Sequence, residues 1–325
     1  MNRRHFIQQT ALLSAAGLLV PESSFAAEFS DTGKRVGIIG LDTGHSEVFT
    51  KMINTGGADM KGYKVIAAYP HGSKDIESAL KMKPDIIKAV QAMGVELVGS
   101  IEELLDKVDV ILLESNDGRV HPEQALKVFK AGKKVFIDKP VASSLADAQA
   151  IFKAAEKYNT PVFSSSALRF DANVQKVVLG SIGSVTGADV YTPGDMDKNH
   201  LDLAWYAIHG IEMLFTVMGT GCRTVTRTHT EGTDLIVGVW NDGRIGTVRA
   251  IRKGASNIAG VAFGEKGIGQ LGPFSSYEPL VEKIITFFET GNPPVSPAET
   301  LEIFKFINAA QESKKRKGAV VEMAY

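Results

Sequence analysis

This 325-residue sequence contains a single cysteine and has almost no net charge. A single cysteine, Cys222, cannot form a disulfide within the chain, so a hydrophobic core must hold the fold together. Basic and acidic residues number 36 and 37, which leaves a net charge of −1 and no basic stripe. This balance argues against a nucleic acid as the partner. Short-period repeats and low-complexity tracts are lacking as well.

No apolar run is long enough for a mature transmembrane helix, which needs about 20 residues. The run at 10–20 is too short, but it follows Arg3-Arg4 and precedes small residues that end at Ala26. This pattern predicts a signal peptide over 1–26, cleaved after Ala26. The arginine pair is typical of twin-arginine signals, which predicts export of a folded protein to the periplasm. A general secretory signal with a chance arginine pair is the alternative.

Cleavage would leave 325 − 26 = 299 residues, a length typical of two domains. From residue 34 onward, apolar strand-like runs alternate with amphipathic helical segments. Strands are predicted at 35–41, 63–70, 95–100, 108–115, 134–140 and 161–168, and helices at 45–54, 84–94, 100–108, 121–132 and 144–159. Ser100-x-x-Glu103 is a capping box, and Ser144 is an N-cap. These units predict an α/β class with a doubly wound parallel sheet, a Rossmann domain over 34–165.

The pattern changes near residue 180, where strand-like runs follow one another without helices between most of them. Strands are predicted at 183–192, 222–230, 234–240, 244–251 and 258–264, and helices at 201–219, 275–291 and 296–318. Strands strung in this way favour an antiparallel sheet. The segment 166–325 is therefore predicted to form an α+β domain with an open antiparallel sheet.

Four motifs resemble the glucose–fructose oxidoreductase / inositol dehydrogenase / MocA (Gfo/Idh/MocA) family. They are ESNDGRVHPEQA (114–125), FIDKP (136–140), ALRF (167–170) and YAIHGIE (206–212). The likeness covers nearly all of 34–322, and FIDKP is its most specific part. It matches the family's Glu-Lys-Pro signature, with Asp138 as the acid.

The resemblance implies a Rossmann domain that binds NAD or NADP. It also implies a second domain that presents a sugar or cyclitol hydroxyl for oxidation or reduction. By the same analogy, the open face of the second sheet implies a homo-oligomer. The implied partner is thus a small-molecule carbohydrate.

Three residues are candidates for the chemistry. Lys139 follows a strand at the edge where open α/β sheets bind ligands, so it is predicted to donate to a substrate oxygen. A strand-end lysine paired with Asp138 is the alternative. The resemblance makes His209 the catalytic histidine. Tyr206 lies three residues earlier on the predicted helix 201–219 and so shares its face.

The same helix departs from the family pattern. The family's Asp-x-Gly-x-His reads Trp205-x-Ala207-x-His209, so the histidine lacks its usual carboxylate. Candidates to replace that carboxylate are Tyr206, Asp202 and Glu212. A Tyr and a His in such a site also resemble the glycosidase branch of the family, which oxidises a ring hydroxyl only transiently. Arg169 and Asp202 are predicted to contact the substrate, with an interdomain salt bridge as the alternative for Arg169.

The nucleotide loop GLDTGH also departs from its usual form. Fitting Gly-x-Gly-x-x-Gly from Gly40 places Asp42 and His45 at the second and third glycines. We expect the Asp42 carboxylate to turn onto backbone amides, so that the hydroxyls of Thr43 and Ser46 bind the pyrophosphate. The alternative is that Asp42 blocks the site and leaves an empty relic. The residues predicted to bind the cofactor here are Gly40, Asp42, Thr43, Gly44 and His45.

The second predicted strand ends without an acid before Asp75, whereas NAD sites commonly have one there. Ser73 and Lys74 are instead predicted to hold a 2′-phosphate, which favours NADP over NAD. The resemblance places the turn 115–117 beside the nicotinamide ribose. The remaining residues assigned to the cofactor site are Ser115, Asn116, Asp138 and His121, the last mainly as packing for the turn.

No metal site is predicted, because the other histidines, His71, His200 and His229, do not form a spaced ligand set. Two classes of function remain. One is a periplasmic NAD(P)-dependent oxidoreductase acting on a sugar, cyclitol or glycoside hydroxyl. The other is a non-enzymatic carbohydrate-binding protein that kept the fold.

Overall fold

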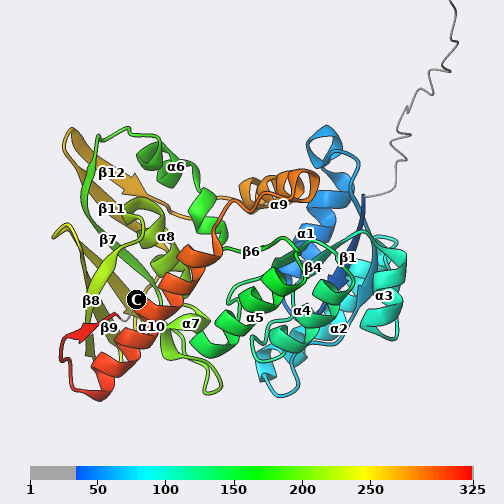
Figure 1. Ribbon diagram of the computed structural model, residues 1–325, viewed down its shortest axis with the longest axis horizontal. Helices are drawn as coiled ribbons and strands as arrows, with labels where there is room; N and C mark the ends of the chain where they lie inside the picture. The colour runs from blue at the N-terminus through cyan, green and yellow to red at the C-terminus, as the bar shows by residue number, and fades with distance from the viewer. Residues whose placement is uncertain (1–33, 324–325) are drawn as a thin grey trace, which may run out of the picture. The chain divides into compact units, whose positions relative to one another are not determined.

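The computed structural model describes residues 34–323 (Figure 1). The predicted signal peptide over 1–26, with its arginine pair, lies outside the described residues. Within 34–323, no helix combines the length and the apolar content needed to cross a bilayer.

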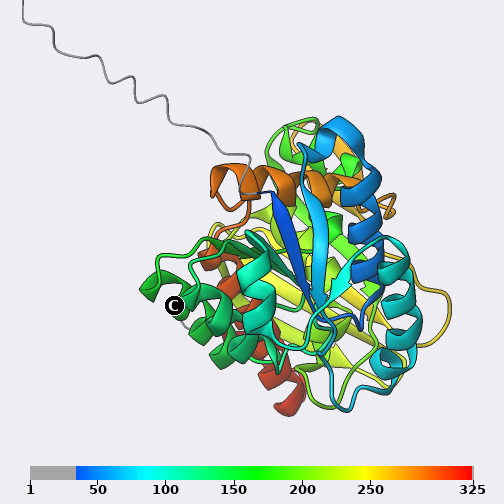
Figure 2. The same cartoon turned by 90° about the vertical axis from the view of Figure 1, so that its right-hand side faces the viewer.

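A six-stranded parallel sheet forms the centre of the first domain (Figure 2). Its strands lie in the order β3-β2-β1-β4-β5-β6, and the sheet is doubly wound, as the sequence predicts. The strands are β1 (Arg35–Ile39), β2 (Lys64–Tyr69), β3 (Glu96–Leu97), β4 (Val110–Leu113), β5 (Val135–Ile137) and β6 (Val162–Ser164).

Helices cover both faces of this sheet, which explains why its strands read as unbroken apolar runs. Val36 and Ile38 of β1 pack into one hydrophobic cluster with α1, α2 and the later helix α9 (Glu278–Thr290). Ile39 points the other way, into a cluster with α3, α4 and α5. The helices of this part of the chain are α1 (Gly44–Thr55), η1 (Gly57–Met60), α2 (Glu77–Ala92), α3 (Ile101–Lys107), α4 (His121–Lys130) and α5 (Leu145–Lys157).

Both predicted helix caps are confirmed. The amide of Glu103 donates to Ser100 Oγ at 3.1 Å, and the amide of Asp147 donates to Ser144 Oγ at 3.1 Å.

The predicted start of the second helix was wrong. The sequence placed it at Pro84, but α2 begins at Glu77 and contains the proline. Pro84 is exposed, so water can hydrate the Leu80 carbonyl that the missing proline amide leaves without an intrahelical donor.

The second domain contains a seven-stranded sheet in the order β12-β11-β7-β10-β9-β8-β13. Its strands are β7 (Val185–Pro193), β8 (Cys222–His229), β9 (Thr233–Trp240), β10 (Ile245–Ile251), β11 (Ala259–Gly264), β12 (Gly267–Leu271) and β13 (Val321–Glu322). The predicted α+β domain is confirmed, and its strands pair antiparallel except for β7 and β10, whose parallel pairing makes the sheet mixed. The connection from β7 to β8 carries helices across the sheet, as parallel alignment of strands requires.

One face of the second sheet is buried beneath helices, and the other is open. Alternate residues of β9, such as Ile236 and Trp240, are buried, while those between them are only partly covered. The predicted helix 201–219 is two helices that meet at Tyr206 and Ala207. The helical segments of this part are η2 (Ala167–Phe170), α6 (Ala172–Val178), α7 (Asp202–Trp205), α8 (Ile208–Met218) and α10 (Pro297–Lys315).

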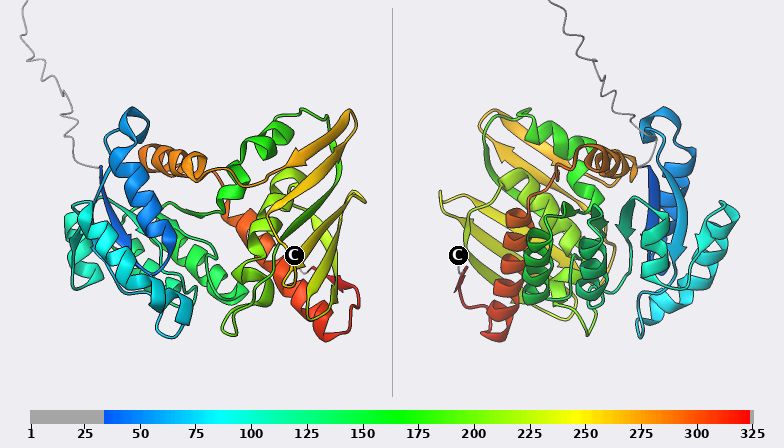
Figure 3. Two further views of the ribbon diagram at one scale, coloured as in Figure 1. Left: turned by 180° about the vertical axis from the view of Figure 1, so that it is seen from behind. Right: turned by 45° about the vertical axis from the view of Figure 1, so that its right-hand side comes forward.

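The helix α9 (Glu278–Thr290) returns to the first domain, although its sequence lies far beyond the predicted boundary at 165. Leu280, Ile284 and Phe287 join the cluster that contains Phe49 of α1 and Phe163 of β6. Figures 1 and 3 show α9 beside α1.

Candidate active site

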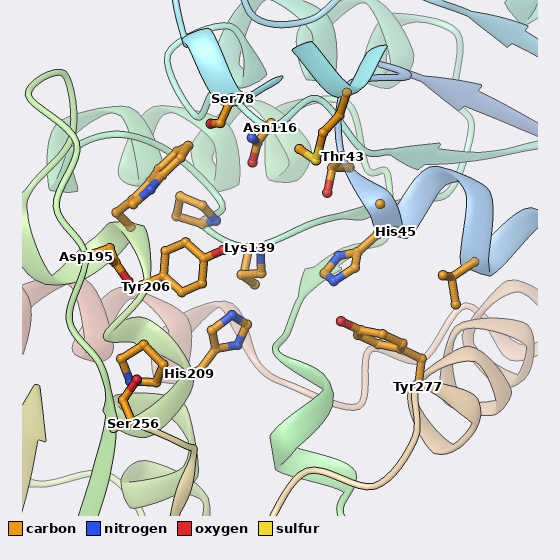
Figure 4. A pocket seen from close by; sticks show the side chains of 16 residues that line it. Thr43, His45, Ser78, Asn116, Lys139, Asp195, Tyr206, His209, Ser256 and Tyr277 are labelled. Carbon is orange, nitrogen blue, oxygen red and sulfur yellow. The ribbon is translucent and has the colours of Figure 1, made fainter. Parts of the chain in front are cut away.

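A cavity of about 810 Å³ lies between the carboxyl edge of the parallel sheet and the second domain (Figure 4). The first domain contributes the start of α1 and the ends of β4 and β5. The second domain contributes the α7–α8 junction and two loops. The lining residues are Thr43, Gly44, His45, Val48, Ser78, Met82, Asn116, Lys139, Pro140, Pro193, Asp195, Trp205, Tyr206, His209, Ser256 and Tyr277.

Asp42 turns its carboxylate away from this cavity, as the sequence led us to expect. Its oxygens accept from the amides of Ser73 at 2.6 Å and Asn116 at 3.1 Å, and the residue is fully buried. One carboxylate therefore ties together the loops that follow β2 and β4. Gly40 lies in the left-handed region with φ +91°, and a Cβ there would come within 2.5 Å of the Ser115 backbone.

The residues of this edge fit a dinucleotide. The twelve-residue helix α1 starts at the cavity, and its N-terminal amides and dipole favour a phosphate. An added Cβ at Gly44 would meet no atom within 4 Å, so the backbone there is open to a close approach. The cavity-lining residues that would hold the cofactor are thus Thr43, Gly44 and Asn116. When bound, the cofactor would accept or donate the hydride.

Lys139 and His45 stand on the first-domain side of the cavity, and both contact Asp138. The Lys139 Nζ lies 3.8 Å from Asp138 Oδ2, and His45 Nδ1 lies 2.8 Å from the same oxygen. His45 stacks on Phe49 with ring centroids 5.2 Å apart, and its ring meets Tyr277 edge-on. Burial alone would raise the pKa of Asp138, but the charges of His45 and Lys139 outweigh it and hold that pKa well below its usual range.

Glu114, at the end of β4, lies behind this group, and the sequence analysis did not single it out. One ring nitrogen of His45 and one carboxylate oxygen each of Glu114 and Asp138 lie within 4.8 Å of one another. Neither Glu114 oxygen has a hydrogen-bond partner among the described residues, and the residue is fully buried. Two carboxylate charges about 5 Å apart repel by about 3 kcal/mol at an effective dielectric constant of about 20. Burial and the charge of Asp138 accordingly raise the pKa of Glu114 well above its usual value.

His209 stands on the second-domain side of the cavity, and a hydroxyl orients it. Its Nδ1 lies 2.7 Å from Ser166 Oγ, and the Ser166 amide donates to Glu212 Oε2 at 2.8 Å. Ser166 therefore orients His209, the role for which the sequence offered Tyr206, Asp202 and Glu212 as candidates. Glu212 contacts the Ser166 amide. Burial and the charge of Lys139 lower the pKa of His209 well below its usual value, so the imidazole stays neutral and able to accept a proton.

Tyr206 also lines the cavity, with its ring centroid 6.3 Å from that of His209 in an edge-on contact. The residue is 44% exposed, so its phenol can reach a ligand. Tyr277 approaches from the segment before α9, and burial raises the pKa of its hydroxyl. Figure 4 shows these two phenols and both imidazoles directed toward the middle of the cavity.

Two residues predicted to bind the substrate are engaged elsewhere. Arg169 is buried, with Nη1 2.5 Å from Glu299 and Nε 3.5 Å from Glu212, and it does not line the cavity. Asp202 binds Lys314 at 2.7 Å and Arg227 at 3.1 Å. Their charges are therefore neutralised within the second domain. Arg169 forms salt bridges, as the alternative held, but within the second domain rather than between domains.

Several predicted cofactor residues have structural contacts instead. Ser46 is buried and donates to the Gly40 carbonyl at 3.0 Å, so its hydroxyl is not available to a pyrophosphate. Ser115 donates to Gln124 at 2.8 Å. His121 lies between the carbonyls of Ser115 and Val141, in line with its interpretation as packing for the turn. Lys74 is exposed next to Ser73, and neither lines the cavity.

Residues at or behind the cavity that the sequence analysis did not assign to the site include Glu114, Ser166, Trp205 and Tyr277. The signal for Ser166 was available, since SSS at 164–166 ends a strand at the binding edge. Trp205 was noted only as a departure from the family pattern. Its ring packs on His200 with centroids 4.8 Å apart, and His200 accepts from the Gly118 amide at 3.1 Å.

The fold and cavity define a two-domain protein with a dinucleotide-type domain facing a mixed-sheet domain. Residues 34–166 match the family model GFO_IDH_MocA, described as an oxidoreductase family with an NAD-binding Rossmann fold. This part of the chain is therefore similar to the Rossmann domain of the Gfo/Idh/MocA oxidoreductase family.

One curated protein is also similar to this chain. An uncharacterized oxidoreductase of Streptococcus pneumoniae is 24% identical over 182 residues, which are 50% of this chain and 49% of that protein. The chain thus aligns with about half the length of this curated relative.

Solved structures with the same fold include a probable dehydrogenase of Thermotoga maritima, with a TM-score of 0.71 and 21% identity over 89% of this chain and 98% of that one. A scyllo-inositol dehydrogenase of Lactobacillus casei with bound NAD(H) and scyllo-inositol has a TM-score of 0.71 and 17% identity over 90% and 100% of the two chains. These identities show a shared fold. Together with the family match, they support the expectation of an NAD(P)-dependent oxidoreductase.

Proposed function

We propose that this protein is an NAD(P)-dependent oxidoreductase that acts on a hydroxyl of a sugar, cyclitol or glycoside. The observation that carries the proposal is the meeting of Lys139 and His209 in one cavity, from two domains, next to the start of α1. His209 is kept neutral and is the base that takes the hydroxyl proton, while Lys139 stabilises the developing oxyanion. Tyr206 is a second donor to the substrate.

The test is cofactor reduction by the purified mature protein with a panel of cyclitols, free sugars and aryl glycosides. We expect reduction of NAD or NADP with at least one polyol, and loss of that activity in Lys139→Ala. Lys153→Ala serves as the control, because Lys153 is exposed on α5 and does not line the cavity. A protein that binds carbohydrate but neither binds nor reduces a nicotinamide cofactor would refute the proposal in favour of the non-enzymatic alternative.

The second candidate is an NAD-dependent glycosidase of the same family. Its support is the pairing of the exposed phenol of Tyr206 with His209, which gives the cavity more proton-transfer groups than one oxidation needs. Release of phenol from an aryl glycoside with no net change in cofactor absorbance would favour this reaction over simple dehydrogenation.

Two further expectations complete the proposal. Export rests on Arg3-Arg4 and the short apolar run. We expect the mature chain to begin near Ala27 in the periplasm, and N-terminal sequencing that finds an intact cytosolic Met1 would refute this. Homo-oligomer formation is supported by the open face of the second sheet, where a hollow of about 770 Å³ includes Tyr191. Light scattering that gives the monomer mass at micromolar concentration would refute it.

A further inference from the structure

We propose that His200 is a positioning residue that couples the cofactor side of the cavity to its substrate side. The inference rests on the proposed oxidation of a hydroxyl. His200 does not line the cavity itself, so it acts through its neighbours. It joins the loop 116–119 of the first domain to Trp205 of the second domain. Cofactor binding at this loop therefore fixes the wall against which the substrate lies.

The loop 116–119 is packed tightly against the first domain. Asn116 lines the cavity together with the start of α1, and its amide donates to the buried Asp42 carboxylate. An added Cβ at Gly118 would come within 2.6 Å of the Ala142 backbone, so the loop packs backbone against backbone on the segment after β5. A cofactor that contacts Asn116 thus meets a loop that moves only with its own domain.

His200 reaches this loop from the second domain in one defined tautomer. The Gly118 amide can only donate, so His200 Nε2 must accept across the 3.1 Å contact. The ring proton is then on Nδ1, which donates to Asp197 Oδ1 at 2.9 Å. Asp117 Oδ1 lies 3.7 Å from Nε2, but that carboxylate already accepts from Arg119. The imidazole is fully buried, so water does not compete for these bonds.

On the substrate side, the coupling ends at Trp205, the last residue of α7 and part of the cavity wall. The rings of His200 and Trp205 pack with their centroids 4.8 Å apart. Asp202, at the start of the same helix, binds Lys314 at 2.7 Å and Arg227 at 3.1 Å. One end of α7 is thus anchored in the second domain, and the other end is tied through His200 to the first.

Hydride transfer requires this kind of alignment between the two walls. A misplacement of about 1 Å between the reacting groups can cost about 10²-fold in rate. Asn116 stands on the cofactor side and Trp205 on the substrate side, and His200 sets their spacing. The Leu201 amide donates to the Ser143 carbonyl at 3.3 Å, which adds a second bond between the domains at this point. Because coupling between two binding sites is reciprocal, the substrate should also strengthen cofactor binding.

The first arm of the test is fluorine NMR of the purified protein labelled with fluorotryptophan, and it needs no substrate. The chain has two tryptophans, so Trp240→Phe assigns the Trp205 resonance. With NAD or NADP bound, we expect one sharp Trp205 resonance in the parent protein. His200→Phe keeps a ring but cannot accept from the Gly118 amide, so the resonance should broaden or split. His200→Gln offers that amide an oxygen and should restore the sharp line, whereas an equally sharp line in His200→Phe would overturn the proposal.

A second variant covers the case in which His200→Phe does not fold. Asp197→Ala frees the imidazole to turn without placing a new group in the interior, and it should broaden the same resonance to a lesser degree. Lys198→Ala is the matched control, because Lys198 is exposed in the same segment and does not line the cavity. Spectra of Asp197→Ala that equal those of this control would also overturn the coupling.

The second arm is kinetic and uses a polyol that the parent protein oxidises. His200→Phe should lower kcat by about 10- to 100-fold while the affinity for cofactor alone changes little, and His200→Gln should recover most of the rate. In a Trp205→Ala background, His200→Phe should cost little more, because the wall that it positions is gone. Fully additive losses, or no recovery in His200→Gln, would make His200 a packing residue and refute the coupling.

The two proposals fail in different ways. A parent protein that binds NAD or NADP but oxidises no hydroxyl would refute the proposed function alone, and the fluorine spectra would still decide the coupling. A parent protein that binds neither cofactor would refute both.

Discussion

Replacing Asp42 with alanine separates two opposite views of the nucleotide loop. The carboxylate accepts hydrogen bonds from the amides of Ser73 and Asn116 in a fully buried position. A hydrogen bond to a charged group contributes about 1.5–3 kcal/mol, so losing both should lower the free energy of unfolding by about 3–6 kcal/mol. Because the two amides belong to the loops after β2 and β4, the edge of the cavity should also lose its fixed shape. Cofactor binding should therefore weaken along with stability.

The assay pairs urea unfolding with calorimetric titration of NAD and NADP. Asp75→Ala is the matched control, since it removes an exposed carboxylate that pairs with Arg119 close to the same loop, and we expect little change from it. If Asp42→Ala binds cofactor more tightly than the parent protein, the carboxylate obstructs the phosphates and the fit of a dinucleotide is wrong. If its stability equals that of the control, the two hydrogen bonds do not hold the loops.

The remaining predictions concern the chemistry and the cofactor. Lys139→Ala and His209→Ala, loaded with cofactor, should each slow single-turnover reduction by about two to four orders of magnitude and leave nucleotide affinity largely intact; parent-like rates in both would make these residues structural. Ser166→Ala should lower kcat and leave cofactor affinity unchanged, because it removes the hydroxyl that orients His209, and an unaltered pH profile would count against that role. The folded-state pKa of His209 is lowered, so the unfolded chain binds the extra proton first and stability should fall as pH drops below about 6.5. His209→Gln should flatten that slope in urea unfolding from neutral to mildly acidic pH, and an equal slope would contradict the lowered pKa. Lys74→Glu should weaken NADP by about 1.5–3 kcal/mol with little effect on NAD, and a clear preference of the parent protein for NAD would contradict the choice of NADP.

The first domain could be predicted closely from the sequence, because short segments of the chain specify its strands and helix starts. Strands buried on both faces are unbroken apolar runs, and Ser100 and Ser144 mark helix starts by a side chain that bonds the helix itself. The conformation of Asp42 was also predictable, since a buried carboxylate beside a phosphate site has few partners other than amides.

Strand direction in the second sheet was not predictable in this way. Whether β7 runs parallel to β10 depends on where the intervening helices bring the chain back, and no local pattern records that. The split of the predicted helix at Tyr206 likewise depends on how the segment packs against the first domain.

The sequence predicted that Lys139 and His209 belong to one site, and the structure brings both to the same cavity. It did not predict the residues behind them. Lys139 and His209 were found through position and resemblance. Glu114 and Ser166 act through contacts with residues distant in sequence, and an acid that ends a strand is usually exposed. Arg169 is the opposite case. It was predicted to bind the substrate, but its charge pairs with the carboxylates of Glu212 and Glu299 in its own domain.

The return of α9 to the first domain has a consequence for synthesis on the ribosome. Phe49 and Phe163 are covered by a helix that ends at Thr290, 290 − 165 = 125 residues after the first domain's own strands are complete. At about 5–20 residues per second, the growing chain carries an uncovered apolar face for about 6–25 seconds. Chaperones that bind apolar surfaces therefore have several seconds in which to bind this chain. A fragment that stops at residue 165 would keep the face exposed, and we expect it to aggregate.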